Sequence, residues 1–96
     1  KTGGYKVGAG EIENSLLEHP AVAEVAVLGE PDDYLGERIV AFVVSESDVH
    51  VDPDDLVNHV ANMLSPHKRP RKIVFLEDLP RNAMGKVVKL ALRKKL

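Results

Sequence analysis

Cysteine and tryptophan are both absent from this chain of 96 residues. The lack of cysteine excludes a disulfide framework and a thiolate metal site, and it is compatible with a cytoplasmic protein. Two tyrosines and two phenylalanines are too few for the aromatic stacking surface of a protein that binds single-stranded nucleic acid. The longest apolar run, residues 39–44, is too short to cross a bilayer, and no signal-peptide pattern is present. We therefore expect a cytoplasmic chain with no membrane span, and its start at Lys1 predicts a piece of a longer protein.

Motifs for metal and nucleotide binding are also lacking. The histidines are scattered, HExxH and the EF-hand spacing are absent, and we expect no metal site in this chain. Gly85-Lys86 invites comparison with a P-loop, but that motif needs glycine at Pro80 and serine or threonine at Val87. Gly3-Gly4 does not begin a GxGxxG motif, although adjacent glycines permit positive φ and a close approach of the backbone to a ligand.

Charge is distributed unevenly along the chain. Residues 1–65 carry 3 basic and 13 acidic side chains, whereas residues 66–96 carry 10 basic and 2 acidic ones. This split indicates an anionic partner for the C-terminal third, or else two halves that neutralise each other in the folded protein. The basic segment Lys68-Arg69-Pro70-Arg71 is suited to gripping phosphates, and a solvated charged loop is the alternative. No helix-turn-helix or basic-region pattern is present, so we expect no nucleic acid partner.

Helices are predicted at three places. Apolar residues at helical spacing indicate a helix over residues 11–18, which Pro20 ends. Asp52 followed by Pro53 is typical of a helix start, because the carboxylate caps the helix and proline fits its first position. Residues 87–96 predict a terminal helix.

Short runs rich in β-branched residues predict strands over residues 22–28, 38–44 and 72–77. The turn-forming residues 29–36 lie between the first two runs and predict an antiparallel hairpin. The continuous apolar run from residue 38 is typical of a strand covered on both faces. The predicted fold is an α+β domain with a small sheet of about three strands flanked by helices, and a short N-terminal β-turn or hairpin near residues 5–7.

Lys86 lies at the end of a loop over residues 78–85. We expect Gly85 to remove local steric bulk, Pro80 to stiffen the start of the loop, and Val87 and Val88 to anchor its other side. The ammonium would then be presented on a short, constrained turn. A lysine held in this way suits the stabilisation of developing negative charge at a carboxylate or phosphate, although an isolated surface lysine is the commoner case.

Four segments resemble, in the same order, the C-terminal domain of adenylate-forming acyl-CoA synthetases, and they read KTGGYKVGAGEIENSLLEHPAV, VLGEPDDYLGERIVAFVV, LSPHKRPRKIVFLEDLP and PRNAMGKVVKLAL. The resemblance runs from Lys1 to about Leu92 and is greatest to bacterial malonyl-CoA synthetases. It implies that residues 1–96 are the mobile C-terminal domain of an enzyme whose large N-terminal domain binds ATP and the acid, with Mg²⁺ accompanying ATP there.

The resemblance also implies a role for particular residues in two successive steps. Lys86 matches the family lysine that reaches the carboxylate and the α-phosphate while acyl-AMP and pyrophosphate form. The domain then turns about a hinge upstream of Lys1, and its opposite face helps coenzyme A thiol attack the acyl-AMP. The residues that match the surface for coenzyme A are Gly3, Gly4 and Tyr5 in the pantetheine channel and Lys68, Arg69 and Arg71 near the nucleotide end. Leu35 stands where some relatives have tryptophan, so no aromatic adenine contact is expected there.

The predicted function is therefore that of the C-terminal part of an AMP-forming acid–CoA ligase acting on malonate or a similar short acid. Its partners would be its own N-terminal domain, ATP, coenzyme A and the acid, and the isolated fragment is predicted to be inactive. Two alternatives within the superfamily are a ligase for another acid and an adenylation domain that loads a carrier protein. An alternative of another class is a stand-alone module that binds phosphate or nucleic acid.

Overall fold

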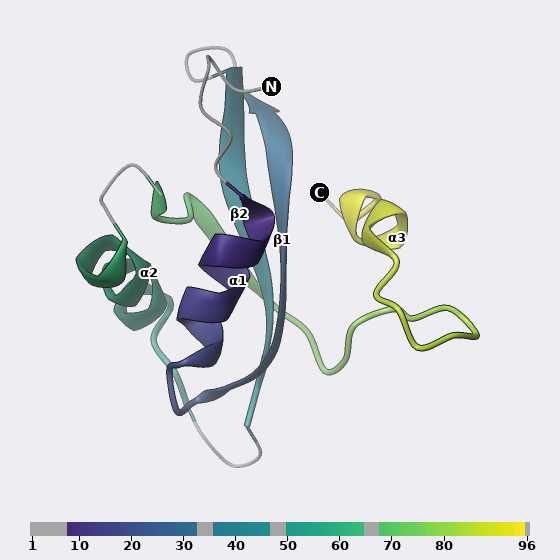
Figure 1. Ribbon diagram of the computed structural model, residues 1–96, viewed down its shortest axis with the longest axis horizontal. Coiled ribbons are helices and arrows are strands. Elements are labelled where there is room, and N and C mark those ends of the chain that lie inside the picture. Colours follow the sequence, from purple (N-terminus) through teal and green to yellow (C-terminus); the bar gives the residue numbers. More distant parts are fainter. Residues whose placement is uncertain (1–7, 33–35, 47–49, 65–67, 96) are drawn as a thin grey trace.

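The computed structural model describes residues 8–32, 36–46, 50–64 and 68–95. In chain order, their elements are α1 (Ala9–Leu17), β1 (Val22–Asp32), β2 (Gly36–Ser45), α2 (Pro53–Met63), β3 (Lys72–Phe75) and α3 (Lys89–Arg93). The strands form one mixed sheet in the order β1-β2-β3, with β1 antiparallel and β3 parallel to the central β2 (Figure 1). None of the helices in this part of the chain approaches the length and apolarity that a bilayer crossing requires. The predicted α+β architecture is confirmed.

The hairpin of β1 and β2 forms the centre of the fold. Its register pairs Val25 with Val43 and continues to Asp32 and Gly36, so the predicted hairpin is confirmed but its strands are longer than predicted. The extension includes Pro31, which is tolerated because β1 lies at the edge of the sheet. Residues 40–44 of β2 are all buried, which confirms a strand covered on both faces.

The sheet separates two apolar clusters. On the α1/α2 face, Ile12 and Leu16 of α1 and Leu56 of α2 pack against strand residues that include Val27 and Val43. On the α3 face, the buried residues are Ala26, Leu28, Val40, Phe42, Val44, Leu79 and Leu92. Figure 1 shows α1 and α2 on one side of the strands and α3 on the other. The chain that carries Lys86 connects Leu79 to α3 and is therefore built on the α3 face.

Local chemistry explains how α2 starts. The Asp52 side chain accepts a hydrogen bond from Asp54 N over 2.9 Å, and Pro53 occupies the first position of α2, so this predicted start is confirmed. Helix α1 begins at Ala9, two residues before the predicted start at residue 11, and ends at Leu17. The turn after it includes Pro20, as expected.

Two predicted elements prove shorter than expected. The third strand was predicted over residues 72–77, but its pairing with β2 ends at Phe75 and the chain bends at residues 77–78. The terminal helix was predicted over residues 87–96, but α3 comprises only Lys89–Arg93. Val87 pairs with Arg81 and Val88 N donates to Pro80 O over 2.8 Å, which keeps both valines extended. The predicted N-terminal strand at residues 5–7 lies outside the described residues.

Candidate functional site

The segment that carries Lys86, named here the lysine loop (residues 80–88), is closed at its base by backbone pairing. Arg81 and Val87 form an antiparallel bridge, and Val88 N bonds to Pro80 O. Just before the loop, Leu79 is buried beside the α3 face of the sheet, and Val87 packs against the same cluster. The loop therefore starts and ends on the apolar core, and the predicted anchoring of its far side by valine is confirmed for Val87.

A single asparagine organises the tip of the lysine loop. Asn82 Oδ1 accepts hydrogen bonds from Met84 N over 2.9 Å and from Lys86 N over 3.0 Å. The Asn82 backbone adds two more bonds, because its N–H donates to Lys86 O and its carbonyl accepts from Gly85 N, each over 2.9 Å. Asparagine favours such turns because its short side chain can replace a backbone acceptor. The backbone at Lys86 is thus held from both sides.

Gly85 is required for a different reason from the one predicted. A Cβ added to it would meet no atom within 4 Å, so steric bulk is not what the loop avoids here. Instead, Gly85 has φ of 83°, in the left-handed region that side chains other than glycine adopt only at a cost. The glycine before Lys86 therefore provides a backbone conformation, not space.

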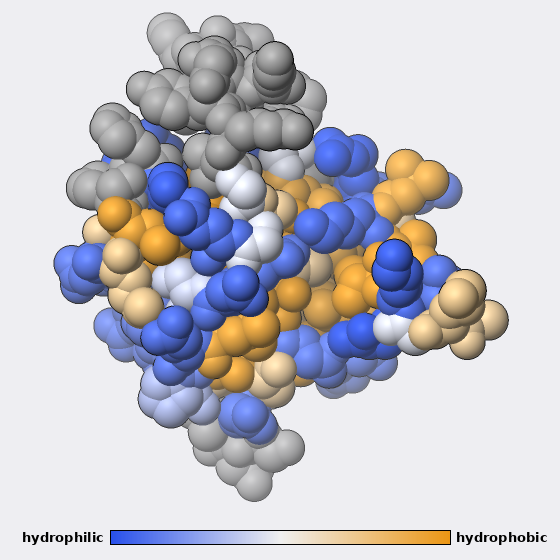
Figure 2. All heavy atoms as spheres, viewed as in Figure 1, coloured by the Kyte–Doolittle hydropathy of each residue, from blue (hydrophilic) through white to orange (hydrophobic). Residues whose placement is uncertain are grey.

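The side chain of Lys86 is exposed, and it makes no hydrogen bond or ion pair with any residue that the structure describes. Its neighbour Met84 is 86% exposed, and Figure 2 shows apolar atoms at the tip of this loop. The loop thus presents a cation near an apolar side chain on a backbone that is held by hydrogen bonds. This arrangement fits the predicted presentation of Lys86 on a constrained turn.

Arg81 links the lysine loop to strand β1, and the sequence analysis missed this residue. Its Nη1 donates to Gly85 O over 2.8 Å, and its Nη2 forms an ion pair with Glu24 Oε1 over 2.6 Å. One guanidinium therefore joins the tip of the loop to the sheet. Arg81 was visible in the sequence as a basic residue of the loop, but nothing local indicated Glu24 as its partner.

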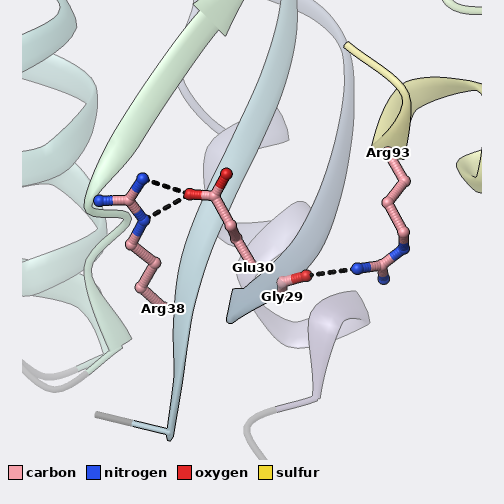
Figure 3. A network of polar contacts seen from close by, with 4 residues as sticks. All are labelled: Gly29, Glu30, Arg38 and Arg93. Atoms are coloured by element: carbon pink, nitrogen blue, oxygen red, sulfur yellow. Dashed lines mark hydrogen bonds and ion pairs between the residues drawn. The ribbon is translucent and has the colours of Figure 1, made fainter. Parts of the chain in front are cut away.

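A second polar link joins the start of α3 to β1 and α1. Lys89 Nζ donates to Val27 O over 3.0 Å and forms an ion pair with Glu13 Oε2 over 3.1 Å. The same carboxylate accepts from Val27 N over 2.8 Å. At the other end of α3, Arg93 Nη1 donates to Gly29 O of the same strand over 2.9 Å (Figure 3). The lysine loop is consequently followed by a helix whose two ends are both hydrogen-bonded to β1.

The predicted residues for coenzyme A are only partly described. Gly3, Gly4 and Tyr5 lie outside the described residues. Lys68 forms an ion pair with Glu11 Oε1 of α1 over 2.7 Å, Arg69 is half-exposed, and Arg71 is exposed with its backbone N–H bonded to Ile39 O over 2.8 Å. The structure therefore brings the basic segment together with the first turn of α1.

The basic segment and the lysine loop lie on different sides of the sheet. Lys68 is bound to α1, which packs on the α1/α2 face, whereas Leu79 and Val87 fix the lysine loop to the α3 face. In Figure 1 the green chain before β3 lies near α2, and the yellow-green loop lies beyond the opposite side of the strands. The basic segment and the lysine loop, which are the described parts of the two groups, therefore lie on two surfaces and not in one pocket.

Ion pairs in the described residues join the acidic and basic parts of the chain. Glu11 with Lys68, Glu13 with Lys89, and Glu24 with Arg81 each pair the N-terminal part with the C-terminal third. These pairs neutralise some of the positive charge of the C-terminal third, as the second interpretation of the charge split expects, and an anionic partner stays a prediction. The Lys86 ammonium forms no ion pair with the described residues.

The chain is similar to known proteins in both sequence and structure. A family model described as AMP-binding enzyme C-terminal domain matches residues 11–86. The human mitochondrial acyl-coenzyme A synthetase ACSM2A is 44% identical over 97 residues, and the mouse mitochondrial malonate–CoA ligase ACSF3 is 44% identical over 96 residues. These matches cover 96% and 100% of this chain but only 17% and 16% of the two relatives.

Among solved structures, a malonyl-CoA ligase in a ternary product complex with methylmalonyl-CoA and AMP is 57% identical to this chain, with a TM-score of 0.74. The match covers 84% of this chain and 18% of that structure's chain. The family model spans most of the sequence, including the lysine loop up to Lys86. The resemblance found in the four sequence segments is thus confirmed, and the chain belongs to the family of AMP-binding enzyme C-terminal domains.

Proposed function

We propose that this chain is the mobile C-terminal domain of an acid–CoA ligase, and that a large domain preceding it binds ATP and the acid. The ligase would form acyl-AMP and pyrophosphate, and then transfer the acyl group to the thiol of coenzyme A with release of AMP. Family membership and relatives that are named as acyl-CoA synthetases and malonate–CoA ligases support this proposal. ATP and coenzyme A are the substrates expected for such a ligase.

The observation that carries the proposal is the exposed ammonium of Lys86, which pairs with no described residue and lies on a hydrogen-bonded loop. Negative charge develops between the acid carboxylate and the α-phosphate during adenylation, and a preorganised cation lowers the energy of that state. A lysine that formed an ion pair with a carboxylate of its own domain would have to break that pair each time it contacted the substrate, and this would cost free energy. Lys86 is exposed and makes no such pair with a described residue, so it is ready to reach into a neighbouring domain.

The second surface would serve the thioester-forming step. Gly3, Gly4 and Tyr5 would form part of the pantetheine channel, and Lys68, Arg69 and Arg71 would meet the phosphates of coenzyme A. Arg71 is exposed and available for such a contact, whereas Lys68 would have to share its charge with Glu11. Because the basic segment and the lysine loop lie on different sides of the sheet, a rotation of the domain would exchange them.

The metal and the acid would both be bound by the large domain. Mg²⁺ would accompany ATP there, and the described residues of this chain contain no group of three or more histidine or acidic side chains placed to hold a metal ion. Malonate or a similar short acid is the proposed substrate, supported by the malonate–CoA ligase and malonyl-CoA ligase among the relatives. A cytoplasmic location remains part of the proposal, and the two relatives named above are mitochondrial.

Two substitutions in the full-length ligase test the assignment of residues to steps. Lys86→Ala should lower pyrophosphate exchange, which reports acyl-AMP formation, by about 100- to 1,000-fold. It should largely spare thioester formation from supplied acyl-AMP. Gly4→Leu should do the reverse, because a side chain there would obstruct the path of the thiol. Lys94→Ala is the matched control, since it removes an exposed lysine outside the lysine loop. Equal damage to both steps from both substitutions would refute the proposal.

A further inference from the structure

Some hydrogen bonds of the lysine loop lie within the loop and others join it to the sheet, and the two kinds have different effects. The bonds of Asn82 all remain inside the loop, so they fix its shape but not its direction relative to the sheet. The apolar contacts of Leu79 and Val87 fix only its base. Near the tip, the connection to the sheet that the structure describes is the guanidinium of Arg81, which bonds to Gly85 O and to Glu24 at the same time.

The hydrogen bond from Arg81 is made to the peptide group directly before Lys86. Gly85 O belongs to the peptide group that joins Gly85 to Lys86, and it is 2.8 Å from Arg81 Nη1. The other terminal nitrogen is 2.6 Å from Glu24 Oε1 on β1. A planar guanidinium bonds in two fixed directions at once, and the single ammonium of a lysine does not reproduce this geometry.

Global stability is not the main effect of this pair. The side chains of Arg81 and Glu24 are 43% and 37% exposed, and solvent-exposed ion pairs contribute little to the stability of a folded protein. Their consequence should instead be local, because they restrict the angle at which the loop projects from β1. A small error in the position of a group that contacts a reacting centre lowers the rate strongly.

We propose that Arg81, held by Glu24, is a positioning residue for Lys86 during acyl-AMP formation. This inference rests on the proposed function, because it assumes that the ammonium of Lys86 acts in that step. It predicts a step-specific defect. When the other surface of the domain faces the substrates, the lysine loop is away from the reacting atoms, and the Arg81–Glu24 pair has no effect on the thioester-forming step.

The test uses the full-length ligase with Arg81→Ala, Arg81→Lys, Glu24→Ala and the double substitution. Arg81→Ala should lower the kcat of pyrophosphate exchange about 10-fold, and thioester formation from supplied acyl-AMP should stay within about twofold of wild type. Arg81→Lys should recover only part of the loss. The double variant should be no worse than Arg81→Ala alone, because residues that act as one unit are not additive.

A matched control is provided by Arg93. This exposed arginine also links the C-terminal third to β1, through its bond to Gly29 O (Figure 3). Among the described residues, no hydrogen bond or ion pair joins its side chain to the lysine loop. Arg93→Ala removes a comparable exposed contact, which contributes little to stability. Because this contact does not hold the lysine loop, both steps should stay within about twofold of wild type. Thermal unfolding of every variant shows whether the protein remains folded at the assay temperature.

The outcomes separate the positioning role from the proposed function. If Lys86→Ala, measured in parallel, leaves pyrophosphate exchange intact, the proposed function fails. If Lys86→Ala abolishes exchange while Arg81→Ala leaves it unchanged, only the positioning role is overturned. The positioning role is also overturned if Arg81→Ala slows both steps equally, or if Arg93→Ala causes the same defect. The positioning role is supported if Arg81→Ala slows pyrophosphate exchange but not thioester formation, and if the double variant is no slower than Arg81→Ala.

Discussion

Replacement of Gly85 by alanine should impair adenylation without unfolding the domain. Gly85 has φ of 83°, and a Cβ added there would meet nothing within 4 Å, so the cost is that of the backbone conformation alone. For a residue with a side chain this cost is about 1–2 kcal/mol in the left-handed region. Because the loop is exposed, the cost should be relieved by local rearrangement and should lower the population of the observed loop about 5- to 30-fold.

The assay for this prediction is pyrophosphate exchange by the full-length ligase. Gly85→Ala should reduce the exchange rate by roughly the same 5- to 30-fold factor as the loop population. Gly85→Asn should reduce it less, because asparagine tolerates positive φ better than alanine does. Gly10→Ala is the control: Gly10 lies in α1, a Cβ there would also meet nothing within 4 Å, and alanine favours a helix.

The reasoning would be refuted by full exchange activity in Gly85→Ala, or by a larger defect in Gly85→Asn than in Gly85→Ala. It would also fail if Gly10→Ala lowered exchange to a similar extent, because the effect would then not depend on the sign of φ. Thioester formation from supplied acyl-AMP should be unchanged in all three variants, since the lysine loop is proposed to act only in the first step.

The remaining predictions concern stability and are measured by urea unfolding of the 96-residue chain. Phe42→Ala should lower the free energy of unfolding by about 3–5 kcal/mol, because Phe42 is fully buried in the central strand and its loss leaves a cavity. A loss below about 1 kcal/mol would contradict the described core. Asp52→Ala should cost about 1 kcal/mol, because it removes the acceptor for Asp54 N, and Asp52→Asn should recover most of this. Equal losses in both Asp52 variants would count against the capping role.

Local patterns were sufficient for most of the secondary structure. The continuous apolar run of residues 38–44 predicted the central strand, because such a strand needs apolar side chains on both faces. The turn-forming residues 29–36 between two strand-like runs predicted the hairpin. Asp52 and Pro53 predicted the start of α2, because capping depends on residues that are adjacent in the chain. The length of α3 was not predictable in this way. It is set by the pairing of Val87 and Val88 with residues 80–81, which competes with the helix.

The sequence was sufficient to select Lys86 as a candidate site residue, but not to find the residues that hold its loop in place. The reason given for Gly85 was wrong, because a sequence shows that glycine lacks a side chain but not which φ the chain needs. Arg81 could not be paired with Glu24, since the two residues are 57 positions apart and many acidic residues were equally eligible. Asn82 carried the one usable signal, because asparagine is common in tight turns.

The outer edge of β1 has a consequence for how the domain meets other molecules. In the part of the chain that the structure describes, β1 has a neighbouring strand on one side only, and an unpaired edge can recruit a strand from another chain. Here the backbone of Val27 is occupied by Glu13 and Lys89, and the carbonyl of Gly29 by Arg93. A foreign strand would have to displace these side chains before it could extend the sheet. Such shielding discourages the addition of a foreign strand, and hence aggregation, along this edge of the sheet.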